Sequence, residues 1–494
     1  MRAVENALNM EIPLNAQYIR NLIIAAHNVH DHIVHFYHLA ALDWVDLVSA
    51  LKADPRKASQ IAEGLSSWDR NSVKEFKEAQ DRLKTFVNSG QLGIYANGYW
   101  GHPAMKLPPE VNLIAAVHYL QALQFQRKAN MIVSILGSKT PHIQNLAVGG
   151  VSNAINLDSP STLNMERLYY IKTLIDEVGS FVKNAYLVDV AAVGAYYAEW
   201  TKYGAGVTNY LSVPDLPMDT RGTVFTMPGG YIENGDLSTY KPITTFGDEY
   251  FKNGVKESIK HSWYKGDWTK HPFDETTDPK YTGMKYDGKY SWVKSPTFYG
   301  KPAQVGPLAN VLCMYAAGHP GTKKNVEQTL STVSSLAGVK VGPSALHSTI
   351  GRIAARAIRC AVLYDELNKQ WQALVDNIAK GDVKTFNRPV FPKGKIKGFG
   401  FHEAPRGVLS HWIVIDGGIT RNYQAVVPST WNASPRNQND AHGPYEASLL
   451  GNPVINPEKP LEVLRTVHSF DPCLACAVHM VDAQGNDIVK VKAL

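Results

Sequence analysis

The sequence is poor in cysteine, with only Cys313, Cys360, Cys473 and Cys476 among 494 residues. So few thiols exclude a disulfide framework and cannot hold a series of iron–sulfur clusters. Cys313 and Cys360 stand alone in apolar, helix-like stretches, where cysteine usually acts as a small hydrophobic residue. Cys473 and Cys476 form a Cys-x-x-Cys pair, which in a large chain indicates a metal or redox site.

Long apolar runs and basic blocks are also absent. No stretch reaches the roughly 18 apolar residues that a helix needs to cross a bilayer, so we predict no segment that spans a membrane unaided. The N-terminal residues 1–22 are amphipathic and lack the layout of a secretory signal, so any export depends on another protein. The net charge of +6 is dispersed, which argues against a nucleic-acid partner. The 24 Tyr and 10 Trp, in contrast, hint at a large interface.

Hydrophobic periodicity predicts an α+β fold that is mainly α, a long-helix bundle with smaller mixed α/β lobes. The predicted helices are about 14–52, a helix that Ser72 caps and Gly90 closes, one from Pro108-Pro109 to Gly137, about 164–200 in two pieces, 323–336 and 344–379. The last segment is predicted to be mostly extended, with a hairpin at Asp416-Gly417-Gly418.

The chain divides by composition into five parts. They are a helical part (1–202), an irregular or β-rich wrapping segment dense in Gly, Pro and Tyr (203–310), a helical return to the bundle (311–382), a β-rich C-terminal part with the Cys-x-x-Cys motif (383–479), and a tail (480–494).

Two short motifs could carry chemistry beside the cysteines. In Glu403-Ala404-Pro405-Arg406-Gly407, a tight turn would fix the direction of Arg406, either as a cation above a reactive centre or as an ordinary surface residue. The run 426–432 (VVPSTWN) could present hydroxyls and amides to a ligand, or could simply end a strand.

A histidine-rich helix is the next feature. It contains His27, His30, His32, His35 and His38. Pairs at helical spacing could bind a metal, but hydrogen-bonded interior histidines are the more common explanation. Asp31 lies in the same apolar helix, and because an unpaired buried carboxylate is costly we expect it to pair with a distant arginine.

The Cys-x-x-Cys motif has several possible meanings by itself. A zinc knuckle needs a second ligand pair, and a thioredoxin-like site belongs early in a βαβ unit; the chain offers neither. His479 and Asp471 flank the cysteines, and soft sulfur beside harder donors suggests a transition metal with a second metal nearby.

Together these motifs resemble the large subunit of nickel–iron hydrogenases, specifically the membrane-associated hydrogen-uptake type of enteric bacteria. The resemblance extends along the whole chain and is most specific in EAPRG and in HSFDPCLACAVH, with support from HDHIVHFYHLAALDWVD, KTPHIQNLAVGGV and NYQAVVPSTWN.

The resemblance implies a role for each matching residue. Cys473 would be a terminal nickel thiolate, and Cys476 would bridge nickel to an iron that carries carbonyl and cyanide ligands. Arg406 would lie above the metals, held by Asp31 and Asp471. Pro405 and Ser429 would line the diatomic ligands, and Ser429 would hydrogen-bond a cyanide. His479 and the backbone carbonyl of Ala425 would bind Mg²⁺.

The resemblance also implies partners. Iron–sulfur clusters would belong to a small subunit that forms a heterodimer, or a dimer of heterodimers, with this chain, and the substrate would be H2. The pair would be exported together to the periplasmic side of the cell membrane, with membrane contact through partner subunits. A nickel-insertion chaperone and an endopeptidase that removes residues 480–494 would act during maturation, so the sequence is predicted to be a precursor.

One departure from the family is expected to matter. Family members carry a segment before the position of Met1, with another Cys-x-x-Cys pair and a Glu for proton transfer and Mg²⁺. Without it, this chain should not assemble an active centre, and we expect either a mis-set start or a truncated, inactive paralogue. A second alternative is a metal-free scaffold resembling the quinone-site subunit of respiratory complex I, against which Cys473, Cys476, Arg406 and His479 argue.

Overall fold

The computed structural model describes residues 1–90 and 99–473. The helices are α1 (Arg2–Ala7), α2 (Leu14–Val34), α3 (Pro55–Leu65), α4 (Val73–Asn88), α5 (Pro109–Gly137), α6 (Met165–Phe181), α7 (Leu187–Tyr196), α8 (Glu249–Gly254), α9 (Pro307–Ala316), α10 (Pro320–Ala337), α11 (Thr349–Ala379), α12 (Pro428–Asn432), α13 (Pro444–Leu449) and α14 (Leu461–Ser469).

The strands are β1 (Leu146–Ala147), β2 (Gly150–Val151), β3 (Tyr210–Ser212), β4 (Asp215–Pro217), β5 (Phe225–Met227), β6 (Gly229–Ile232), β7 (Lys241–Ile243), β8 (Val255–Ser258), β9 (Thr269–Lys270), β10 (Ser295–Phe298), β11 (Lys395–Ala404), β12 (Gly407–Asp416) and β13 (Ile419–Val426). The predicted α+β, mainly α, class is confirmed.

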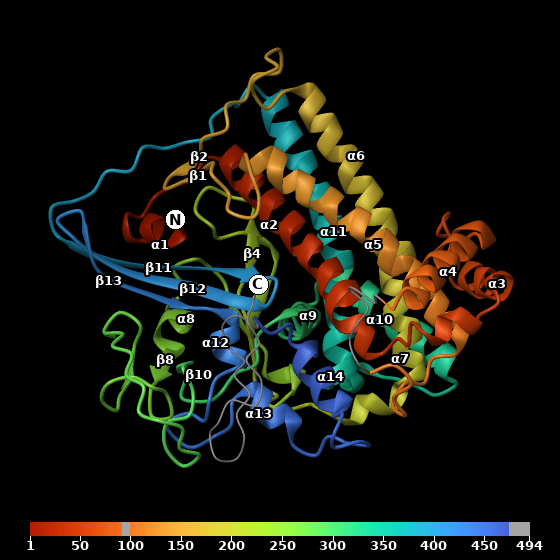
Figure 1. Cartoon of the computed structure of the whole chain (residues 1–494). Coiled ribbons are helices and arrows are strands. Elements are labelled where there is room, and N and C mark those ends of the chain that lie inside the picture. The colour runs from red at the N-terminus through yellow and green to blue at the C-terminus, as the bar shows by residue number, and fades with distance from the viewer. Residues whose placement is uncertain (91–98, 474–494) are drawn as a thin grey trace.

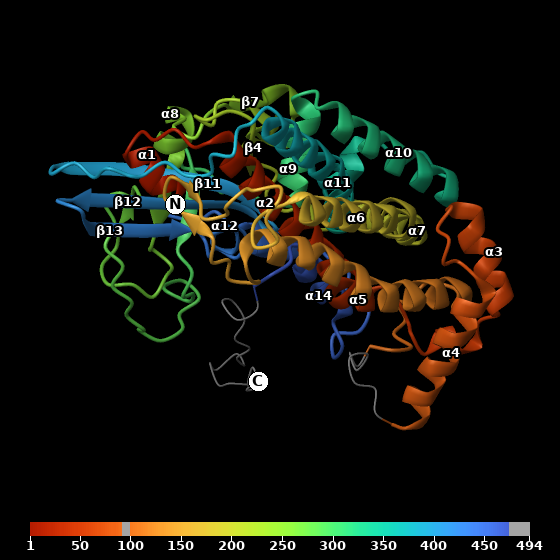
Figure 2. The ribbon, with the colours of Figure 1, turned by 90° about the horizontal axis from the view of Figure 1, so that it is seen from above.

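Long helices form the core of the molecule (Figure 1). α2 packs against both α5 and α11, and α5 packs against α6. The buried face of α11 carries small and branched residues at helical spacing, including Ile353, Ala357 and Ala361, so neighbouring helices can approach closely. The helices α3 and α4 lie at the end of the bundle far from the β11–β13 sheet (Figure 2).

The bounds of the long helices follow local signals. The Ser72 side chain accepts a hydrogen bond from the Glu75 amide and caps α4, and Pro109 occupies the first turn of α5. The prediction of one helix over 14–52 is wrong at its C-terminal end. After α2 the helix continues through a π-helical stretch (His35–Ala40) and a short 3-10 turn (Ala41–Asp43), and it ends where Trp44 packs edge-on against Tyr197 and Trp200.

A three-stranded antiparallel sheet, β11–β12–β13, supports the site. Asp416 pairs with Ile419 across the predicted hairpin, which is confirmed, whereas β11 was not predicted. α1 packs on β11 because two glycines remove side chains there: a Cβ on Gly398 would lie 2.2 Å from the Ala3 carbonyl oxygen. The sheet contributes Phe399, Phe401 and Trp412 to a second hydrophobic core outside the bundle.

Two further expectations need correction. The segment 203–310 contains short strands as predicted, but its end already belongs to α9, which begins at Pro307. The C-terminal part is not mostly extended, because α12, α13 and α14 follow the sheet. These helices are short, so periodicity over a long window does not reveal them: α12 and α13 begin at Pro428 and Pro444, and α14 follows Pro460.

Candidate active site

A cavity of about 320 Å³ lies where β11 turns into β12, where β13 meets α12, and beside the last described residues. Its lining consists of Val293, Ala404, Pro405, Arg406, Val427, Pro428, Ser429, Thr430 and Cys473. The cavity therefore brings together four predicted site residues, Pro405, Arg406, Ser429 and Cys473, that lie on three separate stretches of the sequence.

Arg406 lies in the two-residue turn between β11 and β12. Ala404 pairs with Gly407 across this turn. Gly407 has φ +125°, and a Cβ there would lie 2.4 Å from the Gly306 amide nitrogen, so the turn requires glycine and rests directly on the backbone before α9. The rigid turn expected from the EAPRG sequence is present, and it directs Arg406 to the cavity wall.

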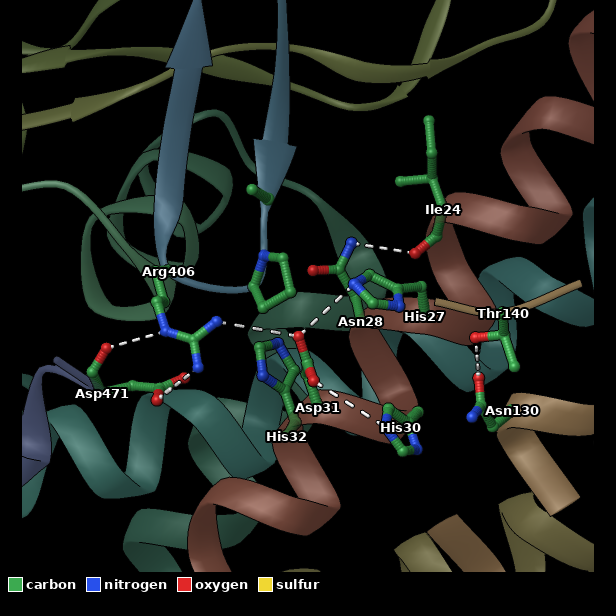
Figure 3. Close-up of polar contacts among 12 residues, drawn as sticks. Ile24, His27, Asn28, His30, Asp31, His32, Asn130, Thr140, Arg406 and Asp471 are labelled. Carbon is green, nitrogen blue, oxygen red and sulfur yellow. Dashed lines mark hydrogen bonds and ion pairs between the residues drawn. The ribbon is translucent and has the colours of Figure 1, made fainter. Parts of the chain in front are cut away.

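Two carboxylates hold the Arg406 guanidinium (Figure 3). Nη2 donates to Asp471 Oδ1 at 3.0 Å, Nε donates to the Asp471 carbonyl at 2.9 Å, and Nη1 lies 3.9 Å from Asp31 Oδ2. Burial opposes the charge, but Asp471, Asp31 and then Cys473 outweigh it and raise the pKa of Arg406. The wall of the cavity therefore carries a fixed positive charge.

Asp471 is the anchor of this arrangement. Its side chain is 1% exposed, and its carboxylate also faces Arg356 Nη1, 3.4 Å from Oδ2. Its backbone has φ +60°, a left-handed conformation that aspartate tolerates better than most residues. This conformation turns the chain after α14 so that both the side chain and the carbonyl of Asp471 reach Arg406.

Asp31 is less buried than its apolar helix suggested, with a side chain that is 20% exposed. Besides Arg406 it faces His27 Nε2 at 3.5 Å and His30 Nε2 at 3.9 Å (Figure 3). The distant arginine expected for it is Arg406, at the outer limit of an ion pair.

The remaining histidines of α2 and its extension bond to protein groups. His30, His35 and His38 each place a ring nitrogen on a backbone carbonyl, of Gln126, His468 and Tyr119. Within residues 1–90 and 99–473, no group of three or more His, Cys, Asp or Glu could hold a metal ion. The interior role preferred for these histidines agrees with their contacts.

The other predicted residues divide into three groups. Ala425 lies on β13 opposite His411 and does not line the cavity. Cys476, His479 and the tail 480–494 lie outside the described residues. Cys313 and Cys360 are fully buried in α9 and α11, away from the cavity, and burial raises the pKa of both thiols. Their interpretation as hydrophobic residues is consistent with this placement.

Arg356 and Arg359 of α11 were not singled out from the sequence. Both are 1% exposed and contact the residues before Arg406. A signal was available, because Arg352, Arg356 and Arg359 recur at helical spacing in an otherwise apolar stretch, and a buried charge requires a partner.

Comparisons with known proteins agree with this site. The family model described as nickel-dependent hydrogenase matches residues 1–479. The chain is 60% identical to the hydrogenase-2 large chain of Escherichia coli (strain K12), over 100% of this chain and 87% of that protein. It is 46% identical to the uptake hydrogenase large subunit of Bradyrhizobium diazoefficiens, over 100% of this chain and 85% of that one.

Solved structures show the same fold. The nickel–iron–selenium hydrogenase from D. vulgaris Hildenborough in its as-isolated oxidised state matches with a TM-score of 0.73 and 25% identity, covering 97% of this chain and 85% of that one. A reduced, active nickel–iron–selenium hydrogenase from Desulfomicrobium baculatum matches with a TM-score of 0.71 and 25% identity, covering 97% of this chain and 85% of that one.

The chain belongs to the nickel-dependent hydrogenases. Within this family of oxidoreductases it is a catalytic large subunit of the nickel–iron type. In the described part of the chain, no helix is both long and apolar enough to span a membrane.

Proposed function

We propose that the cavity beside Arg406 is the H2-activating site, and that Cys473 and Cys476 are thiolate ligands of a nickel–iron centre whose iron carries carbonyl and cyanide. The observation that carries this proposal is that Cys473 and Arg406 line the same cavity while Asp471, two residues from Cys473, binds Arg406. A soft sulfur donor beside a fixed cation suits such a centre. The raised thiol pKa values of Cys313 and Cys360 make them poor metal ligands.

When bound, the centre would supply the chemistry that cleaves H2 heterolytically and would take up the electron pair of the H–H bond. Around it, Arg406 provides a positive field that costs no reorganisation during the reaction, because Asp471 and Asp31 already orient it. The Cys473 thiolate accepts the proton. Pro405, Val427 and Ser429 line the cavity, so the first two would keep water from a bound centre and Ser429 would offer a hydroxyl donor to a cyanide ligand.

The reaction direction we propose is H2 oxidation, with electrons passed to an acceptor through a partner. Its support is the name of the Bradyrhizobium relative, an uptake hydrogenase large subunit.

Metal analysis tests the proposed ligands. Cys473→Ser should lose nickel from the purified complex and with it hydrogen oxidation, whereas Cys313→Ala and Cys360→Ala should keep both. Nickel and iron are measured by mass spectrometry alongside dye reduction by H2. Full nickel content in Cys473→Ser would refute the ligand assignment.

We further propose that His479 and the Ala425 carbonyl bind Mg²⁺. Ala425 is two residues before Val427, which lines the cavity, so its carbonyl could serve a second metal close to the first. His479→Ala should lower the magnesium content of purified enzyme, and the exposed His442→Ala serves as the control. Equal magnesium in both variants would contradict the assignment.

The proposed partner is a small subunit that carries iron–sulfur clusters. The names of the relatives, a large chain and a large subunit, support a two-chain enzyme. With Cys473 and Cys476 assigned to nickel, the isolated Cys313 and Cys360 are too few to hold a cluster in this chain. Affinity purification of this chain should recover a second, cluster-bearing chain, recognised by its electron paramagnetic resonance spectrum. Isolation of an active single chain would overturn the proposal.

We also propose maturation by a nickel-insertion chaperone and by an endopeptidase that cuts after His479, the residue at which the family match ends.

We propose in addition that the chain is exported together with the small subunit to the periplasmic side of the membrane, where partner subunits hold the enzyme. Mass spectrometry of active enzyme should find a C-terminus at His479, and cell fractionation should find it on periplasmic-side membranes. An active chain ending at Leu494, or activity only in the cytosol, would exclude the respective step.

A further inference from the structure

We propose that Arg356 and Arg359, one turn apart on α11, are positioning residues that hold the Pro405–Arg406 turn against the helix bundle. Arg356 in addition holds the Asp471 carboxylate at a fixed position relative to this turn. The inference rests on the proposed role of Arg406, but it concerns two other arginines and has a readout that does not depend on activity.

The two arginines bind three successive carbonyl oxygens, those of the last two residues of β11 and of the first residue of the turn. Arg359 donates from Nη2 to Glu403 at 3.1 Å and from Nη1 to Ala404 at 3.2 Å. Arg356 donates from Nη1 to Pro405 at 3.1 Å. Glu403, Ala404 and Pro405 are therefore each bonded to α11. The turn is held by this helix as well as by the hydrogen bonds between β11 and β12.

Arg356 also reaches the other partner of Arg406. The same nitrogen, Nη1, that donates to the Pro405 carbonyl lies 3.4 Å from Asp471 Oδ2, while Asp471 Oδ1 accepts from Arg406. One buried guanidinium thus sets the distance between the turn and the carboxylate. A small shift of either would break the 3.0 Å bond that orients Arg406, because hydrogen bonds weaken steeply with misalignment.

His32 packs against both guanidinium groups, and as a neutral ring it can accept a hydrogen bond from one of them. Its ring lies between them, with Nδ1 3.4 Å from Arg356 Nη1 and Nε2 3.1 Å from Arg359 Nη1. Burial, and then the two arginines, lower the pKa of His32 well below its ordinary value, so the ring is neutral. Asn310 Oδ1 accepts a further bond from Arg359 Nε at 3.0 Å.

The two arginines differ in what they hold. Arg359 contacts only backbone carbonyls on the hairpin side, whereas Arg356 contacts both the hairpin and Asp471. Loss of Arg356 should therefore disturb Arg406 more than loss of Arg359. Arg465 provides a matched control: it is equally buried and donates to two backbone carbonyls, of Asp43 and Ala104, but does not contact the hairpin or Asp471.

The test compares Arg356→Gln, Arg356→Lys, Arg359→Gln and Arg465→Gln in the purified holoenzyme. We expect kcat to fall about 100-fold in Arg356→Gln, since displacement of a reacting group by about 1 Å has an effect of that order. KM for H2 should change little, and Arg356→Lys, which keeps a buried cation and a donor, should recover part of kcat. Arg359→Gln should be intermediate, and Arg465→Gln should lower thermal stability with a much smaller change in kcat.

A double-mutant cycle separates positioning from general damage. If Arg356 acts through Arg406, Arg356→Gln should cause little further loss of kcat in an Arg406→Lys background. Multiplicative losses, or a wild-type kcat in Arg356→Gln, would overturn the inference. If instead Arg406→Lys alone keeps full activity, the proposed function of Arg406 fails, which is a distinct result.

Hydrogen exchange gives the second readout. The amides of residues 403, 404, 406 and 407 should exchange faster in Arg356→Gln and in Arg356→Lys than in Arg465→Gln, whether or not the variant is active. Unchanged protection of these amides in both Arg356 variants would show that the turn does not depend on Arg356, and would overturn the role proposed for this residue.

Discussion

Two buried ion clusters lie close to the β11–β13 sheet, and their compositions are opposite. In one, the Asp471 carboxylate lies between Arg406 and Arg356. In the other, the Lys294 ammonium lies between Glu257 and Glu275, at 2.6 and 2.5 Å. Each places one ionisable group between two of the opposite kind, although Glu275 holds a proton at neutral pH because burial, and then Glu257, raise its pKa to about 8.

The clusters differ in what lies beyond them. The Arg406 side chain is 33% exposed and lines the cavity, so its charge can act on a bound species. Lys294 is 9% exposed and both glutamates are fully buried, although the neighbouring Val293 lines the same cavity. Burial of charge therefore does not identify a functional site by itself; a charged group that faces a cavity does.

The largest expected effect is on Arg406. Arg406→Lys should lower kcat for H2 oxidation by about 100- to 1,000-fold, because an ammonium cannot reproduce the forked contacts to Asp471 and the field at the cavity wall. The apparent melting temperature should change little, and Arg221→Lys, at an exposed arginine that does not line the cavity, serves as the control. If the variant kept the wild-type kcat, Arg406 and the cavity would take no part in the reaction. The Arg406 cluster would then not differ in function from the Lys294 cluster.

Asp471→Asn should affect both activity and stability. Removing the only carboxylate between two guanidinium groups leaves Arg356 buried without its partner, at a cost of about 3–5 kcal/mol. The activity per folded enzyme should fall by about 10- to 100-fold, as Arg406 loses its main anchor. Denaturant unfolding and H2-dependent dye reduction measure the two effects; a loss of stability alone would make this cluster equivalent to the Lys294 cluster.

Lys294→Met tests the opposite case. It should destabilise the folded chain by about 3–5 kcal/mol, because two buried glutamates lose their shared cation. The activity of the enzyme that remains folded should stay close to that of the wild type, since Lys294 does not line the cavity. The exposed Lys265→Met is the control for stability, and a selective loss of kcat in Lys294→Met would show that this cluster also takes part in the reaction.

The smallest effect concerns pH. Burial, and then Glu257, raise the pKa of Glu275 from 4.5 to about 8. The folded chain then holds a proton that the unfolded chain releases, so this stabilisation is complete below the unfolded pKa and is lost as pH rises through the folded one. The unfolding midpoint should fall between about pH 5 and about pH 8, and Glu275→Gln should flatten that slope while the exposed Glu249→Gln does not. If the unfolding midpoint of Glu275→Gln depended on pH as steeply as that of the wild type, a group other than Glu275 would hold the proton.

Several parts of the site could be predicted from the sequence. The EAPRG motif predicted a rigid turn that directs Arg406, and the Asp416-Gly417-Gly418 motif predicted a hairpin; both are present. The expected partner for Asp31 was right in kind, since the arginine is Arg406, but the contact is long and Asp31 is partly exposed. Nothing local indicated β11, whose glycines matter only because α1 packs on them.

The sequence by itself determined those features that depend on neighbouring residues: the Ser72 cap, the proline at the start of α5, and the tight turn before Gly407. Each arises from backbone preferences and bonds within a few residues. Local patterns did not decide which charges meet: the family resemblance implied that Asp31 and Asp471 hold Arg406, and the tertiary structure added Arg356. Arg406 and Asp471 are 65 residues apart, and Arg356 and Asp471 are 115 apart. Such pairs form because the packing of α11, the hairpin and the C-terminal segment excludes water and brings groups of opposite charge within reach of each other.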